Sequence, residues 1–408
     1  MQSPRVVTER PTQAVIFAGG RGTRMRPLTD TRPKPMIEFQ GKPFMQYTVE
    51  MLRDQGFERV LMLLGYLPDV IRDHFGDGSD LGIQIDYRVT DPDDLTGRRL
   101  ALAADALDPY FMLLYCDNYW PLQMDRMWQR FLAIGAPAMV TVYGNRDDYR
   151  HGKDAVRVGA DGYVEVHDRS RTTPGLKGVE ISYAILPRSV VDLLPADDEL
   201  FEQAVYPQLV ARRELSAFVT HHRYYSVGSL DRLGETEEFF ARRPAVILDR
   251  DGVLNRRPPK AEYVCRPEQF EWLPGSLDAL RLFRDAGYRV IVVSNQAGIA
   301  RGAMSEGDLA AVHERMLRDA EEAGGHIDAI YHCPHGWDDG CECRKPKPGM
   351  LFQAQQDFTL DLTRTVFVGD DERDAEAADA AGCLSAQVTE TTSLLDVTRR
   401  MLEGALVA

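Results

Sequence analysis

The alternation of short apolar runs with amphipathic ones is the feature that most restricts the fold of this chain. From residue 13 onward, runs such as AVIFAGG, RVLMLLGY and YFMLLYCD alternate with helix-like segments such as PFMQYTVEMLRDQG. Short apolar strands separated by helices predict a parallel sheet that helices cover on both faces. A second block, VRVGADGYVEVHD, alternates about an Asp161-Gly162 turn and predicts a hairpin laid against that sheet.

The same pattern begins again close to residue 244. The runs AVILDRD, RVIVVSNQ and TVFVGDD predict strands, and a long helix is expected from Gly307 to Ala323. A chain of 408 residues is long enough for two separate cores. We therefore predict an α/β protein with two open parallel-sheet Rossmann-like domains, over residues 1–242 and 243–408.

The charge and the hydropathy of the chain restrict its partners. A formal net charge of −15 argues against a nonspecific grip on nucleic acid or on an anionic membrane. There is no run of about 18 uncharged apolar residues, and the first residues lack the apolar core of a secretory signal. We expect a cytoplasmic protein that acts on small molecules and has no nucleic-acid or membrane partner.

Two carboxylates follow the first apolar strand of the second domain. Asp249 and Asp251 come directly after AVIL, at the carboxyl end of a strand, where open α/β sheets bind their ligands. Two like charges so close together favour a bound cation or a role in proton transfer. One carboxylate could attack phosphorus while the other protonates the leaving oxygen. An aspartate after a strand is also a common turn residue, so the pair alone is only moderately specific.

Three further segments carry polar residues that suit the same chemistry. RVIVVSNQ ends in Ser294 and Asn295, which can donate hydrogen bonds to a phosphoryl oxygen, and TVFVGDD contains Asp370 after its apolar run. CRKPKPGM supplies Arg344 and Lys345 in front of a helix. Four such sites in this order at successive strand ends are hard to obtain by chance.

This order of motifs resembles the haloacid dehalogenase superfamily of phosphatases. Over residues 244–408, the segments LDRDGVLN, SNQAGIARG, CPH, CRKPKPGM and VGD are most similar to the D-glycero-D-manno-heptose-1,7-bisphosphate 7-phosphatases. The resemblance implies that Asp249 is a nucleophile that forms an aspartyl-phosphate and that Asp251 is the general acid and base. It also implies a Mg²⁺ ion held by Asp370, the Asp249 carboxylate and the Asp251 main chain. Three further residues would steady the transferring group: Ser294, Arg344 and Lys345.

One position departs from this pattern. Some members of the group have a Lys after the last metal-binding Asp, where it touches the substrate, and this chain has Asp371 there. The sequence therefore defines the type of reaction better than it defines the substrate.

A cluster of cysteines lies between two of these motifs. The segment HCPHGWDDGCECRKP contains four N/S ligands, which predict a closed tetrahedral Zn²⁺ site: Cys333, His335, Cys341 and Cys343. In a reducing compartment this spacing favours a metal over disulfides. By pinning the loop, the ion would place Arg344 beside the active site. Histidinol-phosphate phosphatases have a similar loop, so zinc alone does not separate the two groups.

A glycine-rich loop follows the first strand of the chain. The backbone N–H groups of FAGGRGTRMRPLTDTRPKPM, residues 17–36, can approach a phosphate chain, with Arg24 adding a fork of donors and Lys34 a point charge. Neither a Walker motif nor the GxGxxG dinucleotide fingerprint is present.

The extended string G-G-x-G-T-R-x-x-P-L-T followed by P-K-P resembles the sugar-1-phosphate nucleotidylyltransferases, over about residues 13–240. The resemblance implies that Arg24 stabilises the phosphates of a nucleoside triphosphate, that Lys34 neutralises the reacting group, and that Asp117 holds Mg²⁺. Arg169 is then expected to bind the phosphate of the sugar, and Glu180 its hydroxyl groups. Four loop residues would cradle the nucleotide: Gly19, Gly20, Gly22 and Thr23.

Two segments of this half differ from the family pattern. The second metal aspartate of the family is replaced by Ser226, and a serine is a poor ligand for Mg²⁺. The glycine-rich L-G-T segment is rewritten as Leu95-Thr96-Gly97-Arg98-Arg99, which changes the expected wall around the base or the sugar. A weakened or silent transferase is therefore one of the readings.

The two resemblances predict consecutive reactions. A 7-phosphatase that acts on heptose 1,7-bisphosphate leaves a heptose 1-phosphate, and a nucleotidylyltransferase uses a sugar 1-phosphate. The sequence thus predicts nucleotide-heptose synthesis, with guanylyl transfer as the first choice because the resemblance includes the α-anomer route to GDP-heptose. Three alternatives remain open: the first domain activates another sugar, it is a non-catalytic nucleotide-sensing module, or the phosphatase prefers histidinol phosphate.

Overall fold

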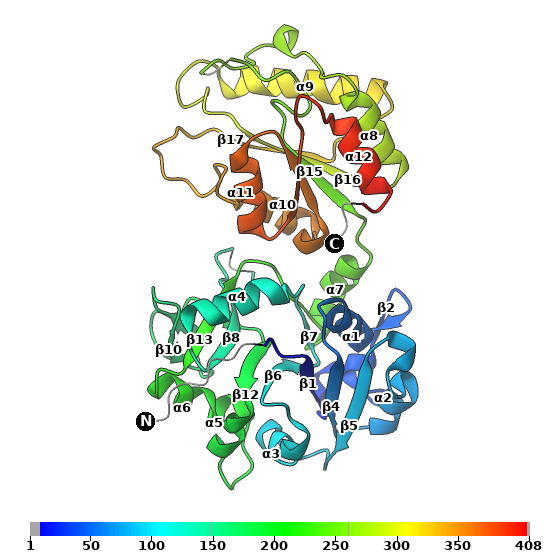
Figure 1. The fold of residues 1–408 in the computed structure, drawn as a ribbon, viewed down its shortest axis with the longest axis vertical. Helices are drawn as coiled ribbons and strands as arrows, with labels where there is room; N and C mark the ends of the chain where they lie inside the picture. The colour runs from blue at the N-terminus through cyan, green and yellow to red at the C-terminus, as the bar shows by residue number, and fades with distance from the viewer. Residues whose placement is uncertain (1–8, 148, 260, 406–408) are drawn as a thin grey trace. The chain divides into compact units, whose positions relative to one another are not determined.

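The computed structural model describes residues 9–147, 149–259 and 261–405 and consists of two compact α/β units (Figure 1). The first unit ends at Ala241 and the second begins at Arg242. None of the described helices combines the length and the apolar character needed to cross a membrane.

The first unit is built on an eight-stranded sheet. Seven strands follow the order β11-β8-β12-β6-β1-β4-β5, and β13 pairs with β8 in parallel outside this path. Alternate residues of its central strand β1 point into two separate cores, Ile16 into one and Val15 and Phe17 into the other, because helices cover both faces. The strands are β1 (Gln13–Ala18), β4 (Arg59–Leu64), β5 (Gln84–Val89), β6 (Tyr110–Tyr115), β8 (Ala138–Tyr143), β11 (Val179–Glu180), β12 (Ala184–Pro187) and β13 (Leu215–Thr220).

This sheet is mixed, whereas the sequence predicts a parallel sheet. β11 and β12 run antiparallel to β8, and β12 also runs antiparallel to β6. The chain between them bends at Ser182 and Tyr183, which have φ values of 77° and 58°. Both strands are too short for the apolar pattern to reveal them.

The expected hairpin is present as a two-stranded antiparallel sheet of β9 (Val156–Val158) and β10 (Val164–His167), which β13 contacts through a bridge between Tyr163 and Ser216. Two more small strands, β7 (Asn118–Tyr119) and β14 (Tyr225–Ser226), pair with each other. A third small pair is β2 (Glu38–Phe39) with β3 (Lys42–Pro43). The α-helices of the unit are α1 (Phe44–Asp54), α2 (Pro68–Phe75), α3 (Thr96–Ala101), α4 (Met124–Ile134), α5 (Phe201–Ala204), α6 (Tyr206–Ala211) and α7 (Leu233–Phe240).

The second unit has a five-stranded sheet with the order β17-β16-β15-β18-β19, and all of its described pairs are parallel. From β15 the chain adds β16 and then β17 on one side of the sheet, and it later adds β18 and β19 on the other side. The strand order therefore reverses at β15. In open α/β sheets ligands bind outside the carboxyl ends of the strands at this point. The strands are β15 (Ala245–Leu248), β16 (Arg289–Asn295), β17 (Ala329–Cys333), β18 (Val366–Gly369) and β19 (Leu384–Gln387).

Helices pack on both faces of this sheet (Figure 1). Val246 and Leu248 of β15 belong to one core, and Ala245 and Ile247 belong to the other. The observed α9 begins and ends one residue before the helix that the sequence predicts. The helices are α8 (Ser276–Asp285), α9 (Glu306–Glu322), α10 (Gly349–Phe358), α11 (Glu372–Ala381) and α12 (Leu394–Leu402).

Candidate active sites

Three carboxylates meet where β15 and β18 end. Asp249 follows β15 directly, Asp370 follows β18 directly, and Asp374 lies in the first turn of α11. One oxygen of each carboxylate lies within 4.8 Å of the others. The pairing of parallel strands β15 and β18 brings the first two together, and the backbone N–H of Asp249 donates to the Val368 carbonyl at 2.9 Å.

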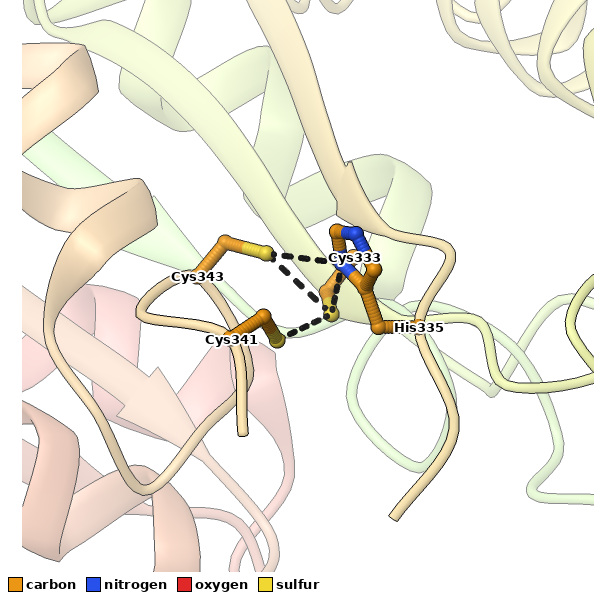
Figure 2. Close-up of side chains that lie close together, drawn as sticks. All are labelled: Cys333, His335, Cys341 and Cys343. Carbon is orange, nitrogen blue, oxygen red and sulfur yellow. Dashed lines mark hydrogen bonds between the residues drawn. The ribbon is translucent and has the colours of Figure 1, made fainter. Parts of the chain in front are cut away.

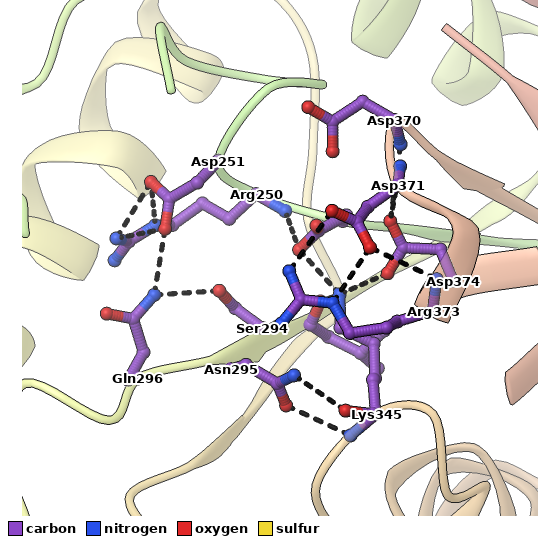
Figure 3. Close-up of polar contacts among 12 residues, drawn as sticks. Arg250, Asp251, Ser294, Asn295, Gln296, Lys345, Asp370, Asp371, Arg373 and Asp374 are labelled. Carbon is purple, nitrogen blue, oxygen red and sulfur yellow. Dashed lines mark hydrogen bonds and ion pairs between the residues drawn. The ribbon is translucent and has the colours of Figure 1, made fainter. Parts of the chain in front are cut away.

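Lys345 is the counter-charge of this cluster. Its Nζ lies 2.8 Å from Asp249 Oδ1. It also lies 2.7 Å from the Oδ1 atom of Asp374 (Figure 3). Burial still raises the pKa of Asp249 to about 7 and that of Asp370 to about 6. Several carboxylates around a single buried ammonium group leave an excess of negative charge, and carboxylate oxygens are the ligands that Mg²⁺ prefers. The residues present therefore fit a divalent cation.

Gly252 allows the loop after β15 to approach this cluster. A Cβ atom on Gly252 would lie 1.8 Å from Asp370 Oδ2, and the residue has a φ of +99°. Both facts require glycine, because the position has no room for a side chain and L-residues rarely adopt this conformation.

Asp251 is held apart from the three-carboxylate group. It accepts hydrogen bonds from Arg250 Nη2 at 2.8 Å, Asn255 Nδ2 at 2.9 Å and Gln296 Nε2 at 3.0 Å. Burial alone would raise the pKa of Asp251, but the charge of the fully buried Arg250 and these donors outweigh it and lower the pKa. The predicted acid–base residue is thus an ionised carboxylate in this arrangement, with Gln296 on one side and Arg250 on the other (Figure 3).

The other residues expected to steady the transferring group surround this site. Ser294 is buried, and its Oγ accepts a hydrogen bond of 2.7 Å from Gln296. Asn295 exchanges two hydrogen bonds of 3.0 Å with the main chain of Lys345, so its amide helps to position the lysine. Arg344 donates from Nη1 to the His335 carbonyl at 3.3 Å.

Sequence reasoning missed several charged residues of this site, among them Asp374 and Arg257. Asp374 also accepts from the backbone N–H of Asp370 and forms a capping box with Asp371, so its sequence signal is that of an ordinary helix cap. Arg257 belongs to the loop after β15, and its Nη2 lies 2.8 Å from Asp370 Oδ1 and 3.2 Å from Asp371 Oδ2. No motif in the sequence singles out Arg257.

The four predicted zinc ligands lie together, with Cys333 at the end of β17 and the other three on the loop that follows it (Figure 2). Cys343 Sγ lies 3.3 Å from Cys333 Sγ and 3.2 Å from His335 Nδ1. Cys333 Sγ lies 3.6 Å from Cys341 Sγ and 3.6 Å from His335 Nδ1. A tetrahedral ion with ligands at about 2.3 Å separates its ligand atoms by roughly 3.8 Å, so a small adjustment of this group suits zinc.

In the first unit, the glycine loop rests on a buried arginine. A Cβ atom on Gly19 would lie 2.3 Å from the Arg99 Cζ, and Arg99 donates to the carbonyls of Leu64 and Asp91 at 2.8 Å. The rewritten segment, which forms the N-cap and first turn of α3, therefore supplies a support beneath the loop. Gly22 has a backbone φ of 62°, in the left-handed region that favours glycine. Gly20 and Thr23 of the same loop are exposed to solvent.

Lys34 and Asp117 form an ion pair of 2.7 Å at the end of β6. Burial opposes ionisation of Asp117, but Lys34 and, more weakly, Arg24 outweigh it and lower the pKa of Asp117. Ser226 lies close by, because a Cβ atom on Gly228 would lie 3.2 Å from Ser226 Oγ and 3.7 Å from Asp117 Oδ2. The Ser226 hydroxyl is buried and accepts a hydrogen bond of 3.1 Å from the Gly228 N–H.

Glu180 lies within electrostatic range of both Asp117 and Arg169. Burial raises the pKa of Glu180 to about 7, the charge of Arg169 opposes the shift, and Asp117 adds to it. Arg169 is partly exposed and forms an ion pair with Glu202. Glu180 therefore links the other predicted sugar-site residue, Arg169, with Asp117.

Comparison with known proteins assigns each unit to a class. A family model described as nucleotidyl transferase matches residues 13–165, and one described as HAD-hydrolase-like matches residues 342–407. A putative glucose-1-phosphate thymidylyltransferase from Bacillus anthracis has the fold of the first unit, at 16% identity and a TM-score of 0.50, over 55% of this chain and 93% of that chain. The protein is therefore an enzyme that joins a nucleotidyl transferase domain to a haloacid dehalogenase-type hydrolase domain.

Relatives of the hydrolase domain identify its family. The D-glycero-beta-D-manno-heptose-1,7-bisphosphate 7-phosphatase of Bordetella bronchiseptica is 44% identical over 138 residues, which are 34% of this chain and 76% of the relative. The D-glycero-alpha-D-manno-heptose-1,7-bisphosphate 7-phosphatase of Campylobacter jejuni is 42% identical over 133 residues, 33% of this chain and 74% of the relative. Through this domain the chain belongs to the heptose-1,7-bisphosphate 7-phosphatase family.

Proposed function

We propose that this protein catalyses two consecutive steps of nucleotide-heptose synthesis. The second unit removes the phosphate at position 7 of heptose 1,7-bisphosphate. The first unit transfers a nucleotidyl group from a nucleoside triphosphate to the resulting heptose 1-phosphate and releases pyrophosphate. The observation that carries this proposal is the buried Asp249–Lys345–Asp374 arrangement at the point where the strand order of the second sheet reverses. This domain belongs to the heptose-1,7-bisphosphate 7-phosphatase family, and the same chain carries a nucleotidyl transferase domain.

In the phosphatase step, Asp249 attacks phosphorus and the bond to the sugar O7 breaks. Asp251 gives a proton to the leaving oxygen, after which water attacks the aspartyl-phosphate, loses its proton to Asp251 and releases inorganic phosphate. Asp251 has to take up a proton before it can act as the acid, and its contacts with Arg250 and Gln296 define the side chain that has to move or change partner. Lys345 and Ser294 line the buried end of the site, where charge on the transferring group is neutralised.

We infer that Asp249 and Asp370 hold Mg²⁺, with the main chain of Asp251 as a third ligand and Asp374 close enough to contribute. When bound, this ion neutralises phosphoryl oxygens and helps to align the attack. We likewise infer that the Cys333, His335, Cys341 and Cys343 group holds one structural Zn²⁺. The hydrogen bond from Arg344 to the His335 carbonyl supports a role for the zinc loop in fixing Arg344.

In the transferase step, Lys34 and Arg24 bind the triphosphate over the glycine loop of Gly19, Gly20, Gly22 and Thr23. Asp117 is the proposed Mg²⁺ ligand, and its ion pair with Lys34 supports a shared reaction centre for the two groups. Arg169 is the proposed contact for the phosphate of the sugar, and Glu180 for its hydroxyl groups. We propose guanylyl transfer to the α-anomer as the first choice for the base and the sugar, and a cytoplasmic location for both steps.

A second function for the first unit is favoured by one observation. The buried Ser226 hydroxyl is bonded to the Gly228 N–H beside Asp117, so this position supplies no second carboxylate for a metal. A nucleotide-binding module without catalysis would tolerate this change. If the unit is catalytic, Ser226→Asp should lower the Mg²⁺ concentration needed for pyrophosphate release; a nucleotide-binding module would release no pyrophosphate with or without the substitution.

One assay tests the whole proposal. The protein is incubated with Mg²⁺, heptose 1,7-bisphosphate and each nucleoside triphosphate in turn, and the products are identified by mass spectrometry. The expected products are inorganic phosphate, pyrophosphate and one nucleotide-heptose, with GTP as the preferred donor. Release of phosphate without pyrophosphate from any triphosphate would leave only the phosphatase half of the proposal standing.

A further inference from the structure

We propose that Arg257 binds the phosphate group that stays on the sugar and thereby makes the phosphatase selective for a bisphosphate. This inference rests on the proposed function of the second unit. It concerns a residue that no sequence motif singles out and that lies at the outer edge of the carboxylate cluster.

Exposure increases from the inside of the site to Arg257. The Lys345 side chain is 2% exposed, that of Asp370 is 13% exposed, and that of Arg257 is 43% exposed. The phosphate that is transferred has to reach Asp249, next to Lys345 at the buried end. A group that touches Arg257 therefore belongs to the part of the substrate that remains nearer to solvent.

The Arg257 guanidinium is held in place but not saturated. Its two hydrogen bonds, to Asp370 and Asp371, both start from Nη2, and neither Nε nor Nη1 has a hydrogen-bond partner among the residues that the structure describes. A guanidinium presents its donors as a planar fork that matches two oxygens of a phosphate. An arginine that is already anchored at one nitrogen loses less conformational entropy when it binds such a group.

Asp371 does not cancel this positive charge by itself. Arg373 donates to both of its carboxylate oxygens, from Nε at 2.8 Å and from Nη2 at 3.1 Å. Asp371 thus already has a bidentate counter-charge, and Arg257 is a second guanidinium beside it. Asp371 is therefore shared by two guanidinium groups, and the proposed Mg²⁺ would offset the charge of Asp370, so Arg257 keeps positive charge for an anionic substituent of the substrate.

The test compares two substrates in the full-length protein with bound metals. Phosphate release is measured with heptose 1,7-bisphosphate and with heptose 7-phosphate, which lacks the retained phosphate. Arg257→Gln should raise the KM for the bisphosphate about tenfold or more, as expected for a lost hydrogen-bonded charge pair. The kcat for the bisphosphate and the KM for the monophosphate should stay near the wild-type values, and the Ki of heptose 1-phosphate as a product inhibitor of phosphate release should rise with the KM.

Arg256→Gln is the matched control, because its side chain is 69% exposed and its guanidinium is paired with Glu271. It should leave both substrates unaffected, and Arg257→Lys should recover part of the lost selectivity. Equal losses of kcat with both substrates in Arg257→Gln would show that Arg257 acts only through Asp370 and would overturn the inference, as would unchanged KM and Ki values. A wild-type enzyme that does not prefer the bisphosphate would instead refute the proposed function.

Discussion

Replacing Lys345 with methionine tests whether one ammonium group holds the carboxylate cluster together. The substitution keeps a buried apolar stem and removes the charge that lies 2.8 Å from Asp249 and 2.7 Å from Asp374. Breaking a buried ion pair by removing one partner typically costs about 3–5 kcal/mol, because the remaining charge is buried without compensation. We expect the free energy of unfolding of the second unit to fall by an amount in this range.

The loss should also depend on pH, in a direction that Asp249 sets. Burial raises the pKa of Asp249 to about 7, and Lys345 opposes that shift, so the pKa rises further in the variant. A carboxyl group with a raised folded pKa contributes stability that is complete below the unfolded pKa of about 3.9 and is lost as the pH rises through the folded pKa. As the pH rises to the wild-type pKa of Asp249, wild type and variant lose this stability equally. Above that pH only the variant continues to lose stability, because its Asp249 has the higher pKa. The deficit should therefore be larger at about pH 9 than at about pH 6.

Pulse proteolysis across a urea series, without added divalent cations, can follow each unit by the size of its surviving fragment. The control is Lys347→Met, which removes an exposed lysine whose Nζ lies 2.9 Å from Glu342. Exposed ion pairs contribute less than about 1 kcal/mol, so this control should stay close to wild type. A loss below about 1 kcal/mol for Lys345→Met, or the same deficit at both pH values, would refute the reasoning.

Three further predictions concern the proposed chemistry. Asp249→Asn should abolish phosphate release from heptose 1,7-bisphosphate but leave pyrophosphate release from a nucleoside triphosphate and added heptose 1-phosphate unchanged, which separate assays of the two reactions measure; near-normal phosphate release would exclude an aspartyl-phosphate. The purified protein should contain one Zn²⁺ per chain, and metal analysis should find it lost in a double variant with Cys341→Ala and Cys343→Ala but kept in Cys383→Ala; zinc that persists in the double variant would contradict the site. Asp117→Ala should lower the kcat for nucleotidyl transfer at least about a hundredfold, because a lost charge stabiliser in a protected site costs about 3 kcal/mol, while phosphate release continues; an unchanged transfer rate would remove Asp117 from the reaction.

Much of the fold was predictable because alternating apolar strands and helices allow few arrangements. The second sheet is parallel with β15 at its switch point, and this places Asp249 and Asp370 side by side as soon as β15 and β18 pair. The first sheet differs from the expectation because β11 and β12 join it antiparallel across a bend at Ser182 and Tyr183. Strands of two and four residues do not produce a readable period.

The sequence by itself determined which residue types stand at the strand ends, and it therefore identified Asp249, Asp370 and the cysteine cluster. Strand direction and short spacing can be read from neighbouring residues alone. The tertiary structure alone decided which distant charges meet them. Asp374 has the sequence signal of a helix cap, yet it lies 2.7 Å from the buried Lys345. Arg257 is one of many arginines in the sequence, and only the path of the loop after β15 brings its guanidinium to Asp370. Contacts of this kind depend on how loops cross in space, which hydropathy and spacing along the chain do not encode.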